Sequence, residues 1–114
     1  MEINLKEQPR IFKIGTEKDI EIQDWGNIIL DKDEMISFKS ENGKNYDVVS
    51  KEWGYYATPS INGRLLDEGF KTALVKNTQN RYYIILVEKE KIDEFFSYIN
   101  KDNQKVVEWL DERT

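Results

Sequence analysis

The sequence contains neither cysteine nor histidine. Without cysteine there can be no disulfide, no thiol nucleophile, no iron–sulfur cluster and no thiolate zinc site. Without histidine, the usual Ser–His and Cys–His pairs, the imidazole ligands of catalytic zinc and the commonest proton carrier near neutral pH are also excluded. Any catalysis would fall to carboxylates, tyrosine, lysine or arginine, and we predict neither a metal ion nor a cofactor.

Long apolar runs and basic clusters are absent as well. No stretch approaches the length of a membrane span, and the first residues lack the basic start and apolar run of a signal peptide. We therefore expect a cytoplasmic protein without membrane contact. The formal net charge is −5 and the lysines are scattered among acids, which disfavours nucleic acid as a partner. The phosphate-loop and dinucleotide glycine patterns are missing too.

What the sequence does contain is enough apolar material for one core. The chain has 114 residues, of which 39% are hydrophobic, so we predict a single domain over residues 1–114. We expect residues 1–8 and 111–114 to be loose termini. The predicted fold class is α+β and predominantly β: a small, mostly antiparallel sheet or partly closed barrel of about 6–8 strands.

Alternating residues and turn formers locate the first strands. Residues 11–14 and 20–23 are predicted strands on either side of a turn at 15–19. Gly26 then interrupts the alternation, which is typical of a bulge that resets the register before residues 28–30 continue the strand.

The clearest local prediction is a hairpin. Residues 35–40 and 44–49 flank Glu41-Asn42-Gly43, and a three-residue loop places its last residue in the left-handed region, where glycine fits. This register sets Phe38 opposite Tyr46 and Ile36 opposite Val48. A two-residue turn would set Phe38 opposite Asp47 instead, so the longer loop is preferred.

The second half of the chain predicts a further sheet covered by a helix. A strand is expected near residues 52–58, followed by a hairpin of 70–75 and 81–87. The unbroken apolar run of residues 82–87 predicts a central strand that is covered on both faces. Residues 90–101 have helical spacing and form an amphipathic helix. Residues 105–110 follow as a short final strand, parallel to the run at 82–87.

For function, the distinctive segment is residues 53–65, in which aromatic and polar side chains are concentrated. Aromatic rings offer flat apolar faces to sugars or to a protein partner, and the polar groups can fix hydroxyls, a carboxylate or a phosphate. The candidate ligand-binding residues are Trp53, Tyr55, Tyr56, Thr58, Ser60, Asn62 and Arg64. A structural interpretation competes with this one: Trp53 and Tyr55 are then inward strand residues, and the rest form an ordinary turn.

Three functions from different classes stay open. The leading one is a noncatalytic binding or accessory domain that uses residues 53–65 to recognise a protein partner or a small polar or anionic ligand. The second is a sugar or sugar-phosphate module with an aromatic platform and Arg64. The third is a small carboxylate- or tyrosine-dependent enzyme acting on carbohydrate, with candidate carboxylates at Asp24, Asp47, Glu52, Asp67 and Glu68. With 22 acidic residues in the chain, some pair will fall near the right distance by chance, so no catalytic residue is assigned. Uncovered sheet edges also predict a homo-oligomer.

Overall fold

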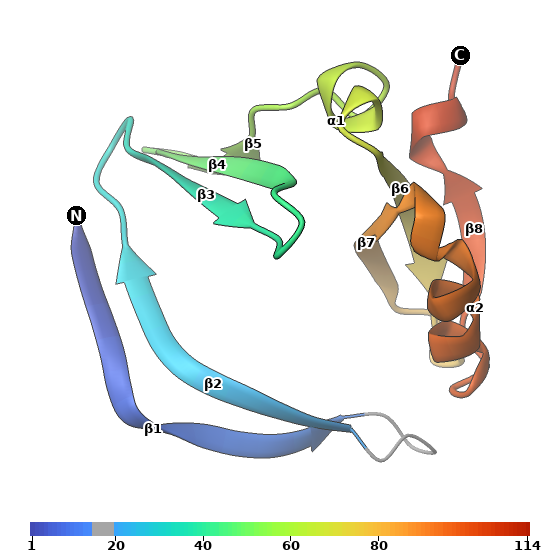
Figure 1. Ribbon diagram of the computed structural model, residues 1–114, viewed down its shortest axis with the longest axis horizontal. Coiled ribbons are helices and arrows are strands. Elements are labelled where there is room, and N and C mark those ends of the chain that lie inside the picture. Colours follow the sequence, from blue (N-terminus) through green and yellow to red (C-terminus); the bar gives the residue numbers. More distant parts are fainter. Residues whose placement is uncertain (15–19) are drawn as a thin grey trace.

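The computed structural model describes residues 1–14 and 20–114, which form three antiparallel sheets and one longer helix (Figure 1). The predicted β-rich α+β class is confirmed, but the strands make three small sheets rather than one, and no barrel is closed among the described residues. The predicted turn at 15–19 lies outside them. No helix of the described chain is long and apolar enough to cross a membrane.

The elements follow one another in a simple order. The strands are β1 (Glu2–Ile14), β2 (Ile20–Ile29), β3 (Met35–Lys39), β4 (Asn45–Lys51), β5 (Gly54–Ala57), β6 (Phe70–Lys76), β7 (Tyr82–Glu88) and β8 (Lys105–Trp109). The helical segments are α1 (Arg64–Asp67), the 3-10 turn η1 (Lys89–Lys91), α2 (Ile92–Asn100) and the 3-10 turn η2 (Leu110–Glu112).

The first sheet is a two-stranded ribbon of β1 and β2, which we call the arm. It leaves β3–β5 and curves round so that its tip lies toward β7 (Figure 1). The pairing register of β1 shifts between Leu5 and Arg10, opposite Gly26 of β2. Gly26 has φ +125°, which L side chains rarely adopt, so the predicted resetting of the register near this glycine is confirmed.

The central sheet has the order β3-β4-β5. Its β3–β4 hairpin has the predicted register, with Phe38 opposite Tyr46 and Ile36 opposite Val48. Gly43 has φ +86°, the left-handed conformation that the three-residue loop requires. This hairpin was predictable because its register depends on a local turn and on cross-strand apolar pairs.

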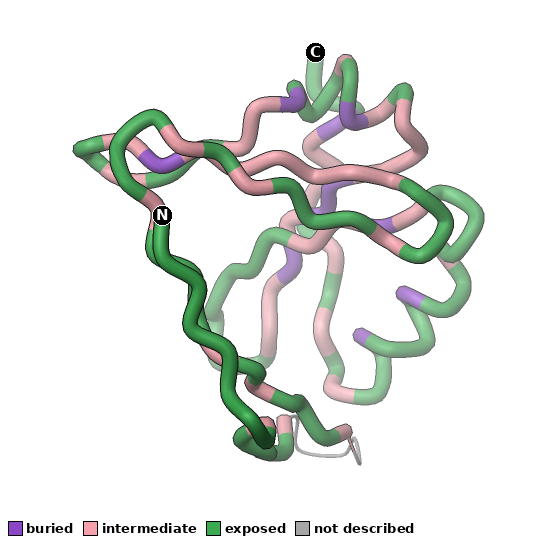
Figure 2. Tube along the Cα trace, turned by 60° about the vertical axis from the view of Figure 1, so that its left-hand side comes forward, coloured by how far each residue is buried: buried purple, intermediate pink, exposed green. Residues whose placement is uncertain are grey.

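The C-terminal sheet has the order β7-β6-β8, and α2 packs on it to form the core. The predicted amphipathic helix at 90–101 is confirmed as α2, preceded by the 3-10 turn η1. The buried core residues are Ala73, Val75, Val87, Phe95 and Ile99, with Ile85, Ile92, Val106 and Trp109 packed around them. Figure 2 shows that burial is concentrated in this half of the chain and is scarce along the arm.

The prediction of a central strand at residues 82–87 is wrong. β7 is an edge strand, and the middle position belongs to β6, whose Ala73 and Val75 are fully buried. Tyr82, Tyr83 and Ile84 are exposed because only the second half of β7 packs under α2. β8 pairs antiparallel with β6, so β8 runs parallel to β7 but on the other side of β6.

Both ends of the described chain contact other elements, and the loose termini expected at residues 1–8 and 111–114 stay a prediction. Residues 2–8 belong to β1, where they extend the arm ribbon. At the other end, Asp111 is buried: its Oδ1 accepts a 2.8 Å hydrogen bond from the backbone N–H of Thr72, and its Oδ2 lies 2.8 Å from Lys71 Nζ. A polar C-terminal segment can be fixed by one buried ion pair, which its composition does not reveal.

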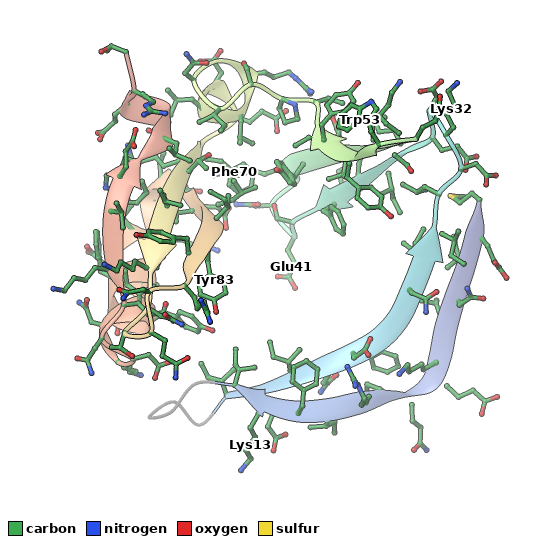
Figure 3. The ribbon with its side chains drawn as sticks, turned by 180° about the vertical axis from the view of Figure 1, so that it is seen from behind. Lys13, Lys32, Glu41, Trp53, Phe70 and Tyr83 are labelled. Atoms are coloured by element: carbon green, nitrogen blue, oxygen red, sulfur yellow. The ribbon has the colours of Figure 1, made fainter. Side chains whose placement is uncertain are left out.

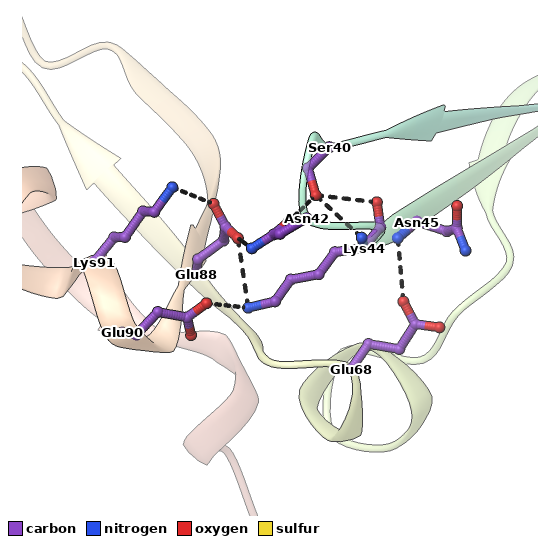
Figure 4. A network of polar contacts seen from close by, with 8 residues as sticks. All are labelled: Ser40, Asn42, Lys44, Asn45, Glu68, Glu88, Glu90 and Lys91. Atoms are coloured by element: carbon purple, nitrogen blue, oxygen red, sulfur yellow. Dashed lines mark hydrogen bonds and ion pairs between the residues drawn. The ribbon is translucent and has the colours of Figure 1, made fainter.

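A group of polar side chains connects the central sheet to the C-terminal sheet (Figure 4). Lys44 Nζ lies 2.6 Å from Glu90 Oε1 and 3.4 Å from Glu88 Oε1, and Asn42 donates a 2.7 Å hydrogen bond to Glu88. We call Asn42, Lys44, Glu88 and Glu90 the inter-sheet network. It joins the β3–β4 loop to the end of β7 and to η1.

Candidate functional site

The candidate site lies on one face of the central sheet, where cross-strand neighbours form two adjacent rows. Ser37 of β3 is paired with Asp47 of β4, and the backbone N–H of Thr58 donates to the carbonyl oxygen of Asp47 at 3.0 Å. Because residues opposite each other in a sheet share a face, these three residues form a polar row. Met35, Val49 and Tyr56 form the neighbouring, largely apolar row on the same face.

Arg64 reaches this face from the first residue of α1. Its Nη1 lies 3.2 Å from Asp47 Oδ2, and its Nη2 donates a 2.8 Å hydrogen bond to Thr58 Oγ1. The Arg64 side chain is still 51% exposed, whereas that of Asp47 is only 14% exposed. A guanidinium group has five N–H donors, so Arg64 can be held by its neighbours and still donate to a ligand.

Two aromatic rings complete the face. The Trp53 and Tyr56 rings are nearly parallel, with centroids 6.1 Å apart and planes inclined by 16°. Trp53 is 71% exposed and Tyr56 is 44% exposed. Tyr56 and Thr58 are two residues apart, so the ring pair lies beside the polar row. We call Trp53, Tyr56, Thr58 and Arg64, together with Ser37 and Asp47, the binding face; Trp53 is labelled in Figure 3.

Not all predicted site residues belong to this face. Tyr55 is paired with Ser50 and projects to the opposite side of the sheet, where it lines a groove with Phe38 and Val48. The three aromatic residues therefore do not form one platform, because strand side chains alternate between faces.

Ser60 and Asn62 lie in the segment that leads into α1. Ser60 Oγ accepts a 3.2 Å hydrogen bond from the backbone N–H of Arg64, and the Ser60 carbonyl accepts from Leu65 N–H at 3.1 Å. Ser60 thus holds the start of the helix and thereby positions Arg64. Asn62 is exposed.

No family model, curated protein or solved structure matches this chain. The binding face is therefore interpreted from its own geometry and charge.

The electrostatics of the binding face stabilise a negative charge on Asp47. Ser37 donates a 2.5 Å hydrogen bond to Asp47 Oδ1, and this bond, together with those from Arg64, holds the pKa of Asp47 below its usual value despite partial burial. Asp47 is consequently ionised at neutral pH and orients the guanidinium group. It is a positioning residue, and it has no tendency to act as a proton donor.

Ser37 was not singled out from the sequence, and Asp47 was considered only as a carboxylate of a possible enzyme, not as part of the ligand-binding segment. The signal for them was present, because the predicted register that sets Phe38 opposite Tyr46 also sets Ser37 opposite Asp47. The link from Asp47 to Arg64 is different: it spans 17 positions and depends on where α1 lies, so no local pattern indicates it.

Residues 1–14 and 20–114 contain no cluster of three or more aspartate or glutamate side chains that could hold a metal ion. The side chains of the binding face offer stacking, hydrogen bonding and ion pairing.

Proposed function

We propose that the protein is a noncatalytic binding domain that recognises a protein partner through the binding face. The observation that carries this proposal is the exposed Trp53–Tyr56 ring pair next to a half-exposed, pre-oriented Arg64. Tryptophan, tyrosine and arginine are the residues that most often dominate the energy of protein interfaces. Because Asp47 and Thr58 already fix the guanidinium group, less side-chain entropy is lost when a partner binds.

A small ligand is the second candidate, specifically a sugar or sugar phosphate stacked on the ring pair with its anion on Arg64. The near-parallel rings favour it. Its weakness is geometric, because small-molecule sites are concave and bury most of the ligand, whereas Trp53 is 71% exposed on a sheet surface. The exposed rings suit a partner that brings its own complementary surface.

A carboxylate-dependent enzyme is the third candidate, and the charge states disfavour it. A general acid needs a carboxyl group whose pKa is raised toward neutrality. Hydrogen bonds and ion pairs instead lower the pKa values of five carboxyl groups in the described chain: Asp24, Asp47, Glu88, Glu90 and Asp111.

A displayed peptide library tests the proposal without knowledge of the natural partner. Peptides selected on the wild-type protein should shift the amide resonances of Tyr56, Thr58 and Arg64 and the indole N–H of Trp53. Trp53→Ala and Arg64→Ala should each weaken a selected peptide about tenfold or more, as expected for hot-spot residues. Tyr82→Ala is the matched control, because Tyr82 is also an exposed aromatic residue, 58% exposed, but lies on another sheet.

The NMR resonances of the binding face also distinguish a protein partner from a small ligand. If monosaccharides or sugar phosphates shift them in a saturable way, the second candidate replaces the first. If selected peptides map to a different surface, or if Trp53→Ala binds them as tightly as the wild type, the binding face is not a recognition site and the proposal fails.

A further inference from the structure

Apart from the binding face, the described chain exposes a second and larger apolar surface. On the arm, Phe12 is paired with Ile22, so both project to the same side of the ribbon, and they are 40% and 38% exposed. Nearer its base, Leu5 is 73% exposed. In Figure 3 the side chain of Lys13 points away from the sheets, so its neighbour Phe12 is on the side that faces them.

The body of the protein presents apolar residues toward this side of the arm. At the base of the arm, a groove of about 390 Å³ is lined by Leu5, Trp25 and Ile28 together with Phe38 and Tyr55 of the central sheet. Near the tip, a hollow of about 510 Å³ lies between Ile14 and the edge strand β7, where Tyr83 and Ile84 are exposed. We call these surfaces together the inner surface of the arm.

The exposed area exceeds that of a compact monomer of this mass. The chain has an accessible surface of 8417 Å², whereas a compact 13.6 kDa monomer exposes about 6,600 Å². The excess of roughly 1,800 Å² is within the area that each subunit of an obligate dimer buries, about 1,000–2,500 Å². The radius of gyration agrees, because it is 15.8 Å where a chain of this length is expected to have about 13 Å.

Within residues 1–14 and 20–114, the arm is a sheet of two strands, and each strand has a partner strand on one side only, which leaves its outer backbone groups without a partner strand. Two-stranded ribbons are marginally stable in water, and free edges are templates for pairing with another chain. A partner that covers the inner surface would therefore stabilise the arm itself.

We propose that the inner surface of the arm is covered by a second copy of this chain, with the arms of two copies packed against each other's sheets. The excess area selects this occupant because it is what each chain of a symmetric dimer would bury. The charge agrees: the described strands of the arm carry four acids, Glu2, Glu7, Glu21 and Asp24, and three bases, Lys6, Arg10 and Lys13. Although the whole chain has a charge of −5, two nearly neutral arms can approach without strong repulsion.

Light scattering coupled to gel filtration tests the assembly. The wild type should have twice the 13.6 kDa mass of one chain. Leu5→Lys and Phe12→Lys should each halve that mass while the helical circular-dichroism signal stays unchanged, because a lysine ammonium group cannot be buried in an apolar contact without a partner and α2 packs in the core of the C-terminal sheet. Ile11→Lys is the control and should stay dimeric: Ile11 is 57% exposed but is on the outer face of the same strand.

Isotope-filtered NMR on a mixture of labelled and unlabelled wild-type protein locates the interface without any substitution. Contacts between copies should join Phe12 or Ile22 to residues of the central sheet or β7. A wild type that stays monomeric over a full concentration series overturns the proposal, even if the inner surface then binds another protein. Intermolecular contacts confined to the binding face or to β8 overturn it too. Because the inner surface and the Trp53–Tyr56 pair lie on different faces, either proposal can fail alone.

Discussion

Among single side chains, Asp111 makes the most consequential buried contacts. Its side chain is 1% exposed, and it binds both the ammonium group of Lys71 and the backbone N–H of Thr72. Lys71 Nζ also lies 4.9 Å from the centre of the Trp109 ring. Asp111 thus ties η2 to β6, the middle strand of the C-terminal sheet, and closes one side of the core.

Removal of the Asp111 carboxylate should be costly. Asp111→Ala leaves the Thr72 N–H without its acceptor and removes the nearer of the two carboxylates bound to Lys71, so we expect the free energy of unfolding to fall by about 2 kcal/mol. Glu112→Ala is the control: Glu112 is also an ion-pair partner of Lys71, at 3.5 Å, but its side chain is 63% exposed. Its loss should change stability by less than about 0.5 kcal/mol. Urea denaturation of both variants measures the difference, and equal losses would contradict the assignment.

The carboxyl group of Asp111 also makes the stability of the fold depend on pH. Burial raises the pKa of Asp111, but the hydrogen bonds from Lys71 and Thr72 outweigh burial and leave the pKa below its usual value. A carboxyl group whose pKa is lower in the folded state than in the unfolded state stabilises the fold above the unfolded value, about 3.9, and this contribution is lost as the pH falls. The stability difference between wild type and Asp111→Ala should therefore shrink below about pH 4.

Among strands and helices, the pairing of neighbouring strands could be predicted from the sequence, whereas the position of a strand within its sheet could not. The β3–β4 register followed from Gly43 and from the pairing of Phe38 with Tyr46, all within a few residues of one turn. The edge position of β7 did not follow, because an apolar run has the same pattern whether another strand, a helix or a second chain covers it. The arm shows the same ambiguity: its sequence alternates like a buried strand, yet Leu5 is exposed.

In the candidate site, too, local features could be predicted from the sequence and long-range contacts could not. Strand alternation alone separates Tyr55 from Tyr56, so this division of the aromatic residues could have been predicted. The contact between Asp47 and Arg64 could not, because it depends on how the chain from β5 to α1 turns back over the sheet.

Gly26 allows the two strands of the arm to approach closely at the register shift. A Cβ at this position would overlap the carbonyl oxygen of Asn4 on the paired strand, and its φ of +125° is unfavourable for any L side chain. Gly26→Ala should therefore destroy the register shift and leave the amides of β1 and β2 exchanging rapidly with deuterium.

A second glycine separates clash from backbone strain. Gly54 has φ +143°, but a Cβ there has no atom within 4 Å. Gly54→Ala should therefore lower the free energy of unfolding only by the cost of the strained backbone, about 1–3 kcal/mol, and should leave the amides of the arm as protected from hydrogen exchange as in the wild type. Hydrogen exchange followed by mass spectrometry compares the two variants, and arm protection that survives Gly26→Ala would show that the arm is held by something other than its own pairing.

In the assembled chain, the inter-sheet network connects the central sheet to the C-terminal sheet. Lys44 and Glu88 are largely shielded, with side chains 17% and 16% exposed. The ion pair with Glu90, and then that with Glu88, raises the pKa of Lys44. In turn, Asn42 and the neighbouring lysines lower the pKa of Glu88, and Lys44 lowers that of Glu90. Each group therefore favours the charged form of the others at neutral pH.

Lys44→Met keeps all but the last atom of the side chain near Phe70 and removes its charge. Hydrogen exchange should accelerate in the β3–β4 loop and in η1, because the connection between the sheets is weakened. Lys32→Met removes an equal charge from an exposed pair with Glu52 that does not link two sheets, and it should leave exchange unchanged.

The network should also make stability depend on pH. Because the pKa values of the two glutamates are lowered, the contribution of the network to the free energy of unfolding is lost as the pH falls below about 4.3. Because the pKa of Lys44 is raised, that contribution persists until the pH exceeds about 10.4. The stability difference between wild type and Lys44→Met should thus be flat between these limits and disappear in acid, whereas a difference that persists at low pH would assign the effect to packing of the lysine stem on Phe70.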